Sequence, residues 1–192
     1  FRETFGGLHK KFLVEPDMAM FGKALGNGYA ITSVIGKKEI MEAAQNSFIS
    51  STFWTERIGP VAGLKTLEVM EKKESWDIIT ELGEYITKCW DQIANENMLP
   101  ISTGGLSALC NFTLNLDKWL KYKTLITQEM LKVGYLASNS VYVCTEHNKQ
   151  IIDKYISNLN KVFSLIYDCE NGKDIDELLN GPVCHTGFKR LN

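Results

Sequence analysis

The chain has 192 residues, 44% hydrophobic and 23% charged, which is enough to bury the core of one large domain or two smaller ones. Its formal net charge is -2 and no block of Lys and Arg stands out, which argues against nucleic acid as a partner because phosphate binding requires clustered basic side chains. No apolar run reaches the length of a membrane span, so no membrane partner is expected.

The five cysteines are an odd number with no close pair such as C-x-x-C, so neither a disulfide framework nor a zinc site is expected. The histidines His9, His147 and His185 also lack metal-like spacing, and we expect no metal. Reduced thiols fit a cytoplasmic protein. The chain opens with Phe1-Arg2, without an initiator methionine or a signal peptide, and the expectation is a fragment that begins inside a domain.

The first part of the chain alternates predicted strands and helices. Two short apolar segments, 13–21 and 29–35, predict buried strands of a parallel sheet. Residues 37–44 predict a short helix. A longer helix is expected over about 57–71, with Thr55 as its N-cap because a hydroxyl oxygen can accept from the free amides of the first turn.

The second part changes its pattern. Apolar residues recur at helical spacing and predict a helix with Ser75 as its cap; they are Ile78, Ile79, Leu82, Tyr85, Ile86, Cys89, Trp90 and Ile93. Residues 106–116 alternate apolar and polar side chains, which predicts a strand with one buried face in an antiparallel sheet. A helix over about 122–133, short strands over 135–144 and a last amphipathic helix complete the pattern. The tail from Glu170 has a weaker pattern and is expected to be only partly ordered.

Lys23 is the residue whose setting points most directly to a chemistry. It follows the apolar run 18–21 and lies between Gly22 and the turn Gly26-x-Gly28. A lysine attacks a carbonyl only after losing its proton, and burial favours the neutral amine. At the end of a buried strand, where ligands approach α/β sheets, such an amine suits a Schiff base with an aldehyde cofactor. The spacing alone leaves open a solvated loop lysine.

The segment 15–30, Glu-Pro-Asp-Met-Ala-Met-Phe-Gly-Lys-Ala-Leu-Gly-Asn-Gly-Tyr-Ala, resembles the cofactor-lysine segment of class III aminotransferases, which are pyridoxal-phosphate enzymes of fold type I. Phe1-Arg2 look like the end of that family's Asp-Glu-Val-x-x-Gly-Phe-Arg segment. The chain is most similar to the glutamate-1-semialdehyde 2,1-aminomutase branch. The resemblance implies that Lys23 holds pyridoxal 5'-phosphate as a Schiff base and, once freed, moves the α-proton of the substrate.

A second match is the run 50–53, Ser-Ser-Thr-Phe, followed by Ala62-Gly63. In the family a threonine here reaches across a dimer interface to the cofactor phosphate of the partner subunit, so the resemblance implies a homodimer with Thr52 as a cofactor-binding residue. The alternative for Thr52 is a hydroxyl-rich capping loop. The family's Gly-Asn-Pro is replaced by Thr-Glu-Arg at 55–57, which favours a substrate other than the tetrapyrrole precursor on which the aminomutase acts. Trp54 and the arginine of that run either shape a substrate pocket or, for Trp54, belong to the core.

The resemblance implies an α/β protein in which residues 1–72 end the large parallel-sheet domain and residues 73–192 form a small α+β domain. The implied reaction moves an amino group between a small-molecule amino donor and a carbonyl acceptor. An aminotransferase of amino-sugar or other amino-metabolite biosynthesis and a non-catalytic scaffold are the alternatives. The family's ring-nitrogen aspartate, phosphate loop and stacking aromatic would precede residue 1. The chain alone is therefore expected to bind the cofactor poorly and turn over little.

Overall fold

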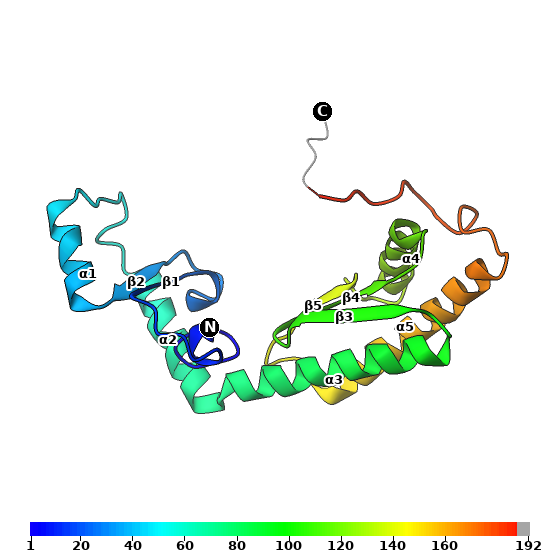
Figure 1. The fold of residues 1–192 in the computed structure, drawn as a ribbon, viewed down its shortest axis with the longest axis horizontal. Helices are drawn as coiled ribbons and strands as arrows, with labels where there is room; N and C mark the ends of the chain where they lie inside the picture. The colour runs from blue at the N-terminus through cyan, green and yellow to red at the C-terminus, as the bar shows by residue number, and fades with distance from the viewer. Residues whose placement is uncertain (188–192) are drawn as a thin grey trace. The chain divides into compact units, whose positions relative to one another are not determined.

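The computed structural model describes residues 1–187, and the chain divides into two compact units, 1–78 and 79–192 (Figure 1). Within residues 1–187, no helix combines the length and the apolar character needed to cross a membrane. The five residues of 188–192, at the end of the predicted small domain, lie outside the described part of the chain.

The first unit contains a two-stranded sheet, one long helix and several short turns. Its elements are η1 (Leu8–Lys10), β1 (Met18–Phe21), η2 (Lys23–Leu25), β2 (Ser33–Gly36), α1 (Lys38–Glu42), η3 (Ala43–Asn46) and α2 (Ile58–Lys73). The strands predicted over 13–21 and 29–35 are present but shorter. Their pairing is antiparallel, with Met18 opposite Gly36, and not parallel as predicted.

Local geometry explains both differences. Leu13 adopts a left-handed backbone with φ 55, and the Val14 amide donates to the His9 carbonyl at 3.0 Å, so the chain is still turning where the prediction began a strand. The connection 22–32 holds only the 3-10 turn η2. A parallel pair requires a longer crossover, whereas a short connection reverses the chain into an antiparallel pair.

The strands of the first unit also differ from the prediction in burial. Across residues 1–78, Leu25 is the only large apolar side chain that is buried. Met20 of β1 is 77% exposed and Phe48 of the following loop is 95% exposed. The apolar sequence therefore makes a strand with one exposed face and one half-buried face within its own unit.

The second unit is an antiparallel sheet covered by helices. Its elements are α3 (Ser75–Glu96, which begins in the first unit), β3 (Ile101–Leu106), β4 (Leu109–Leu114), α4 (Trp119–Lys132), β5 (Ser140–Tyr142) and α5 (Lys149–Glu170), with the strands in the order β3-β4-β5. The helix predicted from Ser75 and the last amphipathic helix are confirmed. β4 alternates half-buried and buried residues, as the sequence predicts, whereas β3 was missed because Gly104-Gly105 interrupts its apolar pattern.

Three aromatic rings form the centre of this unit. Phe112 of β4 lies 4.8 Å from the Trp90 ring and 5.7 Å from the Phe163 ring, between ring centroids. The Trp90 indole N–H donates to the Tyr155 hydroxyl at 3.0 Å, which joins α3 to α5 and satisfies a buried donor. This closed core gives the second unit the stabilising burial that the first unit lacks.

The described part of the tail after α5 packs against α4. Ile175 is buried in the core, and the Gln128 side chain binds the backbone at Leu178 and Asn180. The α4 helix ends before Gly134, whose φ of 88 is the left-handed conformation expected at that position.

Candidate functional site

Lys23 opens the η2 turn directly after β1. Its φ of 47 is left-handed, a conformation that costs a residue with a side chain about 1–2 kcal/mol. The Gly22 carbonyl accepts from the Leu25 amide at 3.0 Å and the Lys23 carbonyl accepts from the Gly26 amide at 3.2 Å. The Lys23 side chain is exposed within the described residues, and not buried as the sequence suggested. Strained backbone of this kind is found disproportionately at functional positions.

Helix α2 packs against the turn that contains Lys23. Gly63 of α2 faces Leu25, and Gly59 faces the backbone of Ala30. Both glycines are buried. The absence of side chains on this face of the helix allows the segment that carries Lys23 to lie against it.

The predicted phosphate residue Thr52 is exposed in the loop that leads into the same helix. The cap of that helix is not Thr55, as predicted, but Glu56: its carboxylate accepts from the Gly59 amide at 3.0 Å and from the Ile58 amide. These two amides hold the pKa of Glu56 below its ordinary value. The sequence offered a signal for this cap, because an acidic residue stands just before the helix, where its charge complements the helix N-terminus.

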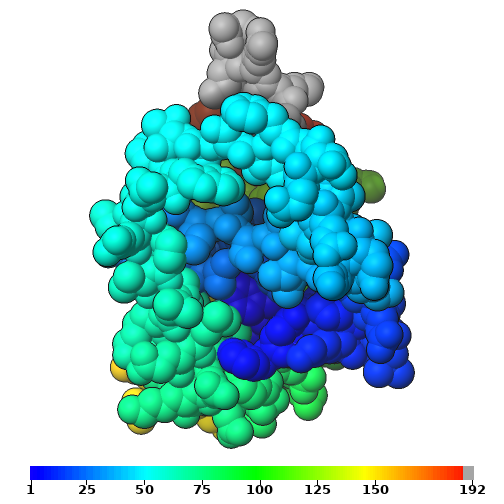
Figure 2. All heavy atoms as spheres, turned by 90° about the vertical axis from the view of Figure 1, so that its left-hand side faces the viewer, coloured from blue at the N-terminus to red at the C-terminus, as the bar shows by residue number. Residues whose placement is uncertain are grey.

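Lys23 and Thr52 are not hydrogen-bonded to each other within residues 1–187. Trp54 is 69% exposed and Arg57 is also exposed, so neither belongs to a core in the described structure. Figure 2 shows the corresponding face of the first unit, where the cyan segment around residues 45–60 arches over a hollow bordered by the blue β1–β2 region. The described residues contain no His, Cys, Asp and Glu cluster able to hold a metal ion.

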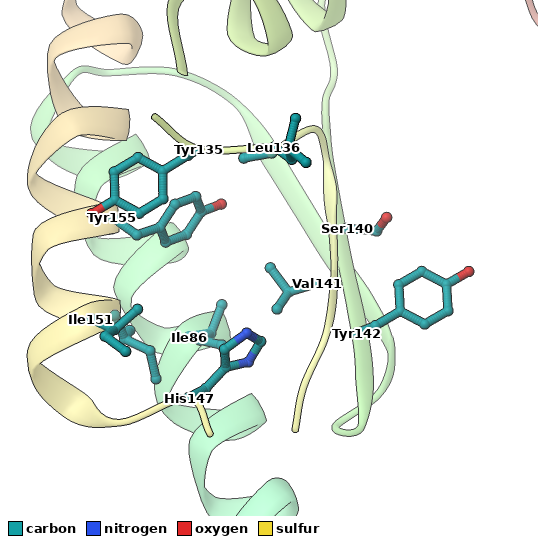
Figure 3. A pocket seen from close by; sticks show the side chains of 11 residues that line it. Ile86, Tyr135, Leu136, Ser140, Val141, Tyr142, His147, Ile151 and Tyr155 are labelled. Atoms are coloured by element: carbon teal, nitrogen blue, oxygen red, sulfur yellow. The ribbon is translucent and has the colours of Figure 1, made fainter. Parts of the chain in front are cut away.

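A pocket that the sequence did not predict lies in the second unit, with a volume of about 320 Å³. Figure 3 shows Val141, His147 and Tyr155 pointing toward a common space, whereas Tyr142 points away from it. The His147 Nδ1 accepts from the Cys144 amide at 3.3 Å, which leaves the Nε2 atom to carry the proton of the neutral ring. The lining is mostly apolar and contains neither of the predicted site residues.

Comparison with known proteins identifies the family that the chain matches. The family model of class-III aminotransferases matches residues 3–162. The chain is 36% identical over 129 residues to a 3-aminobutyryl-CoA aminotransferase of Cloacimonas acidaminovorans, covering 67% of the chain and 31% of the relative. It is 27% identical over 184 residues to a glutamate-1-semialdehyde 2,1-aminomutase of Wigglesworthia glossinidia brevipalpis, covering 86% of the chain and 42% of that relative.

A solved structure of a transaminase with pyridoxal phosphate bound matches the fold with a TM-score of 0.79 and 17% identity, covering 89% of this chain and 43% of the other. The chain thus has the fold of part of a type I pyridoxal-phosphate transferase, although both of its own described sheets are antiparallel. It spans less than half the length of each of these three proteins. The match over 3–162 covers most of its residues, and the chain belongs to the class-III aminotransferase family.

Proposed function

We propose that this chain supplies the cofactor-binding lysine, Lys23, of a pyridoxal-phosphate-dependent aminotransferase or aminomutase. The observation that carries the proposal is the placement of Lys23: a lysine held in a left-handed backbone at the end of β1, with an exposed side chain, inside the segment that resembles the family's cofactor-lysine segment. Because the chain spans 31–42% of its two relatives, the activity is proposed for a complete enzyme that contains this segment.

The residues present fit the aldehyde of the cofactor better than its phosphate. The Lys23 amine is accessible, and a Cβ built at Gly28 would meet no atom within 4 Å, so open space borders the turn. The amides at the start of α2 are already bonded to Glu56 and are not free for a phosphate. This leaves the Thr52 hydroxyl as the phosphate donor that we propose from this part of the chain.

Each residue has a distinct role in the proposed reaction. The Lys23 amine would hold the cofactor covalently and, once free, would take a proton from the substrate Cα and return a proton. When bound, pyridoxal phosphate would supply an electron sink next to that carbon. Because the resemblance implies a threonine that reaches across a dimer interface, we propose that Thr52, which is exposed in its own copy, serves the partner subunit of a homodimer. Residues 1–72 and 73–192 are assigned to the large and the small domain.

The experiment compares Lys23→Ala with Lys72→Ala, a change at an exposed lysine of α2. In the complete enzyme, Lys23→Ala should abolish turnover and leave the far-ultraviolet circular dichroism unchanged, whereas Lys72→Ala should keep activity. Near-normal turnover in Lys23→Ala would contradict the proposal. If the enzyme with intact Lys23 neither binds the cofactor nor reacts with any amine, the non-catalytic scaffold is the better account.

A second candidate is an aminotransferase for an amino metabolite other than glutamate semialdehyde. Two observations favour it: the Thr-Glu-Arg run at 55–57 in place of the family's Gly-Asn-Pro, and the higher identity to the 3-aminobutyryl-CoA aminotransferase than to the aminomutase. A panel of amino donors with aldehyde and keto acceptors separates the two reactions, because only the aminomutase reaction converts a single substrate without a separate acceptor.

A further inference from the structure

Helix α2 meets the segment after the Lys23 turn through one exceptionally close contact. A Cβ placed on Gly59 would lie 2.5 Å from the Ala30 carbonyl oxygen and 3.2 Å from the Ile31 Cβ. Side chains essentially never approach a backbone oxygen at 2.5 Å, so the backbone of residues 30–31 has to move if Gly59 gains a methyl group. Glycine is therefore required at position 59 for the observed packing.

The contact at Gly59 is linked to Lys23 by backbone packing. A Cβ on Gly26 would lie 1.9 Å from the Tyr29 carbonyl oxygen, so the turn and the residues leading to Ala30 are closely apposed. The Gly26 amide in turn donates to the Lys23 carbonyl at 3.2 Å. A displacement at Ala30 has few ways to relax without moving the turn, because close-packed backbone transmits strain.

We infer that Gly59 is a positioning residue for Lys23: by admitting the Ala30 backbone against α2, it holds the Lys23 turn in its left-handed form and fixes the direction of the amine. The inference rests on the proposed function, because it assigns the purpose of this contact to the cofactor lysine. It concerns the second residue of α2, which acts through the backbone of residues 30–31 and not through a side chain of its own.

The chain contains a matched control in Gly63, one turn further along α2. A Cβ at Gly63 would meet the Ile31 Cδ1 at 3.5 Å and the Leu25 Cγ at 3.7 Å, which are ordinary contacts with side chains. Both glycines are buried residues of α2 four positions apart, so each replacement by alanine adds one methyl group to the same face of the helix. The difference between Gly59→Ala and Gly63→Ala therefore isolates the contact with the Ala30 backbone.

The first measurement is amide hydrogen exchange by NMR on the full 192-residue chain. In Gly59→Ala the Gly26 amide should exchange on the order of tenfold faster than in the unsubstituted chain, because forced overpacking destabilises its surroundings. In Gly63→Ala the exchange should be unchanged or slower. Equal exchange at Gly26 in the two variants would overturn the inference.

The second measurement uses the complete enzyme that contains this segment. It is reduced with borohydride in the presence of pyridoxal phosphate, and the modification of Lys23 is quantified by mass spectrometry against Lys72 on α2. Preferential modification of Lys23 should be lost in Gly59→Ala and kept in Gly63→Ala; equal preference in both variants would overturn the inference. If the unsubstituted protein modifies Lys23 no more than Lys72, the proposed function fails, and so does the purpose assigned to Gly59, even where hydrogen exchange shows that Gly59 supports the turn.

If Gly59→Ala does not fold, the unsubstituted chain still decides the question. The structure requires a nuclear Overhauser contact between the Gly59 Hα and the Ile31 side chain. Its presence supports the packing on which the inference depends, and its absence overturns the inference.

Discussion

The turn that contains residue 23 should be more stable with glycine at that position than with alanine. This is the reverse of the order found in the interior of a helix. The φ of 47 at Lys23 costs any residue with a Cβ about 1–2 kcal/mol, a cost that glycine avoids. Glycine in turn loses about 0.5–1 kcal/mol more than alanine through the entropy of the unfolded chain. The difference leaves Lys23→Gly more stable than Lys23→Ala by roughly 0.5–1 kcal/mol in local opening of the turn.

The amides of Leu25, Gly26 and Asn27 report this opening directly, because each donates to a carbonyl of residue 22 or 23. After correction for intrinsic rates, they should exchange about two- to five-fold more slowly in Lys23→Gly than in Lys23→Ala. The control is Lys72 in α2, where alanine should be favoured over glycine by about 1 kcal/mol. Slower exchange in Lys23→Ala than in Lys23→Gly would refute the assignment of a left-handed backbone to Lys23.

Two further predictions concern the core and the helix cap. Phe112→Ala should lower the free energy of unfolding of the second unit by about 3–5 kcal/mol, because it removes a fully buried ring. The control is Leu136→Ala, at a side chain 98% exposed, which should change that free energy by less than about 0.5 kcal/mol. Urea unfolding measures both variants, and equal effects would contradict the described core. Because folding lowers the pKa of Glu56, its cap should persist down to a pH below the ordinary glutamate range and be lost as pH falls through the lowered value, so the Gly59 amide shift should titrate there; a midpoint at the ordinary value would count against the cap.

The second unit was predicted well because the apolar positions in its sequence are buried by contacts within the same unit. Most of the α3 residues that the sequence placed on one stripe lie in or against the core of the second unit, and the alternation of β4 matches its buried face. The missed strand, β3, contains Gly104-Gly105 and so lacks apolar residues that would reveal it. Glycine contributes no side chain to a core, and a strand that includes a pair of them gives no alternation to detect.

The first unit was predicted less well for a different physical reason. The apolar residues of β1 and β2 are typical of buried strands, yet in this unit they are only half-buried or exposed. Their sequence therefore indicates more packing than this unit supplies by itself. Lys23 was singled out from its neighbours in the sequence, but its left-handed backbone was not predicted, because no glycine or asparagine stands at that position to signal it. Glu56 was missed because its neighbour Thr55 belongs to the residue types preferred at helix N-caps.

The most direct test of the account is the fate of one amine. The complete enzyme is incubated with pyridoxal phosphate, reduced with borohydride, digested and analysed by mass spectrometry. The account predicts a stable pyridoxyl adduct on Lys23, formed in preference to the exposed Lys72. A spectrum in which Lys23 is unmodified while cofactor is bound elsewhere would contradict it.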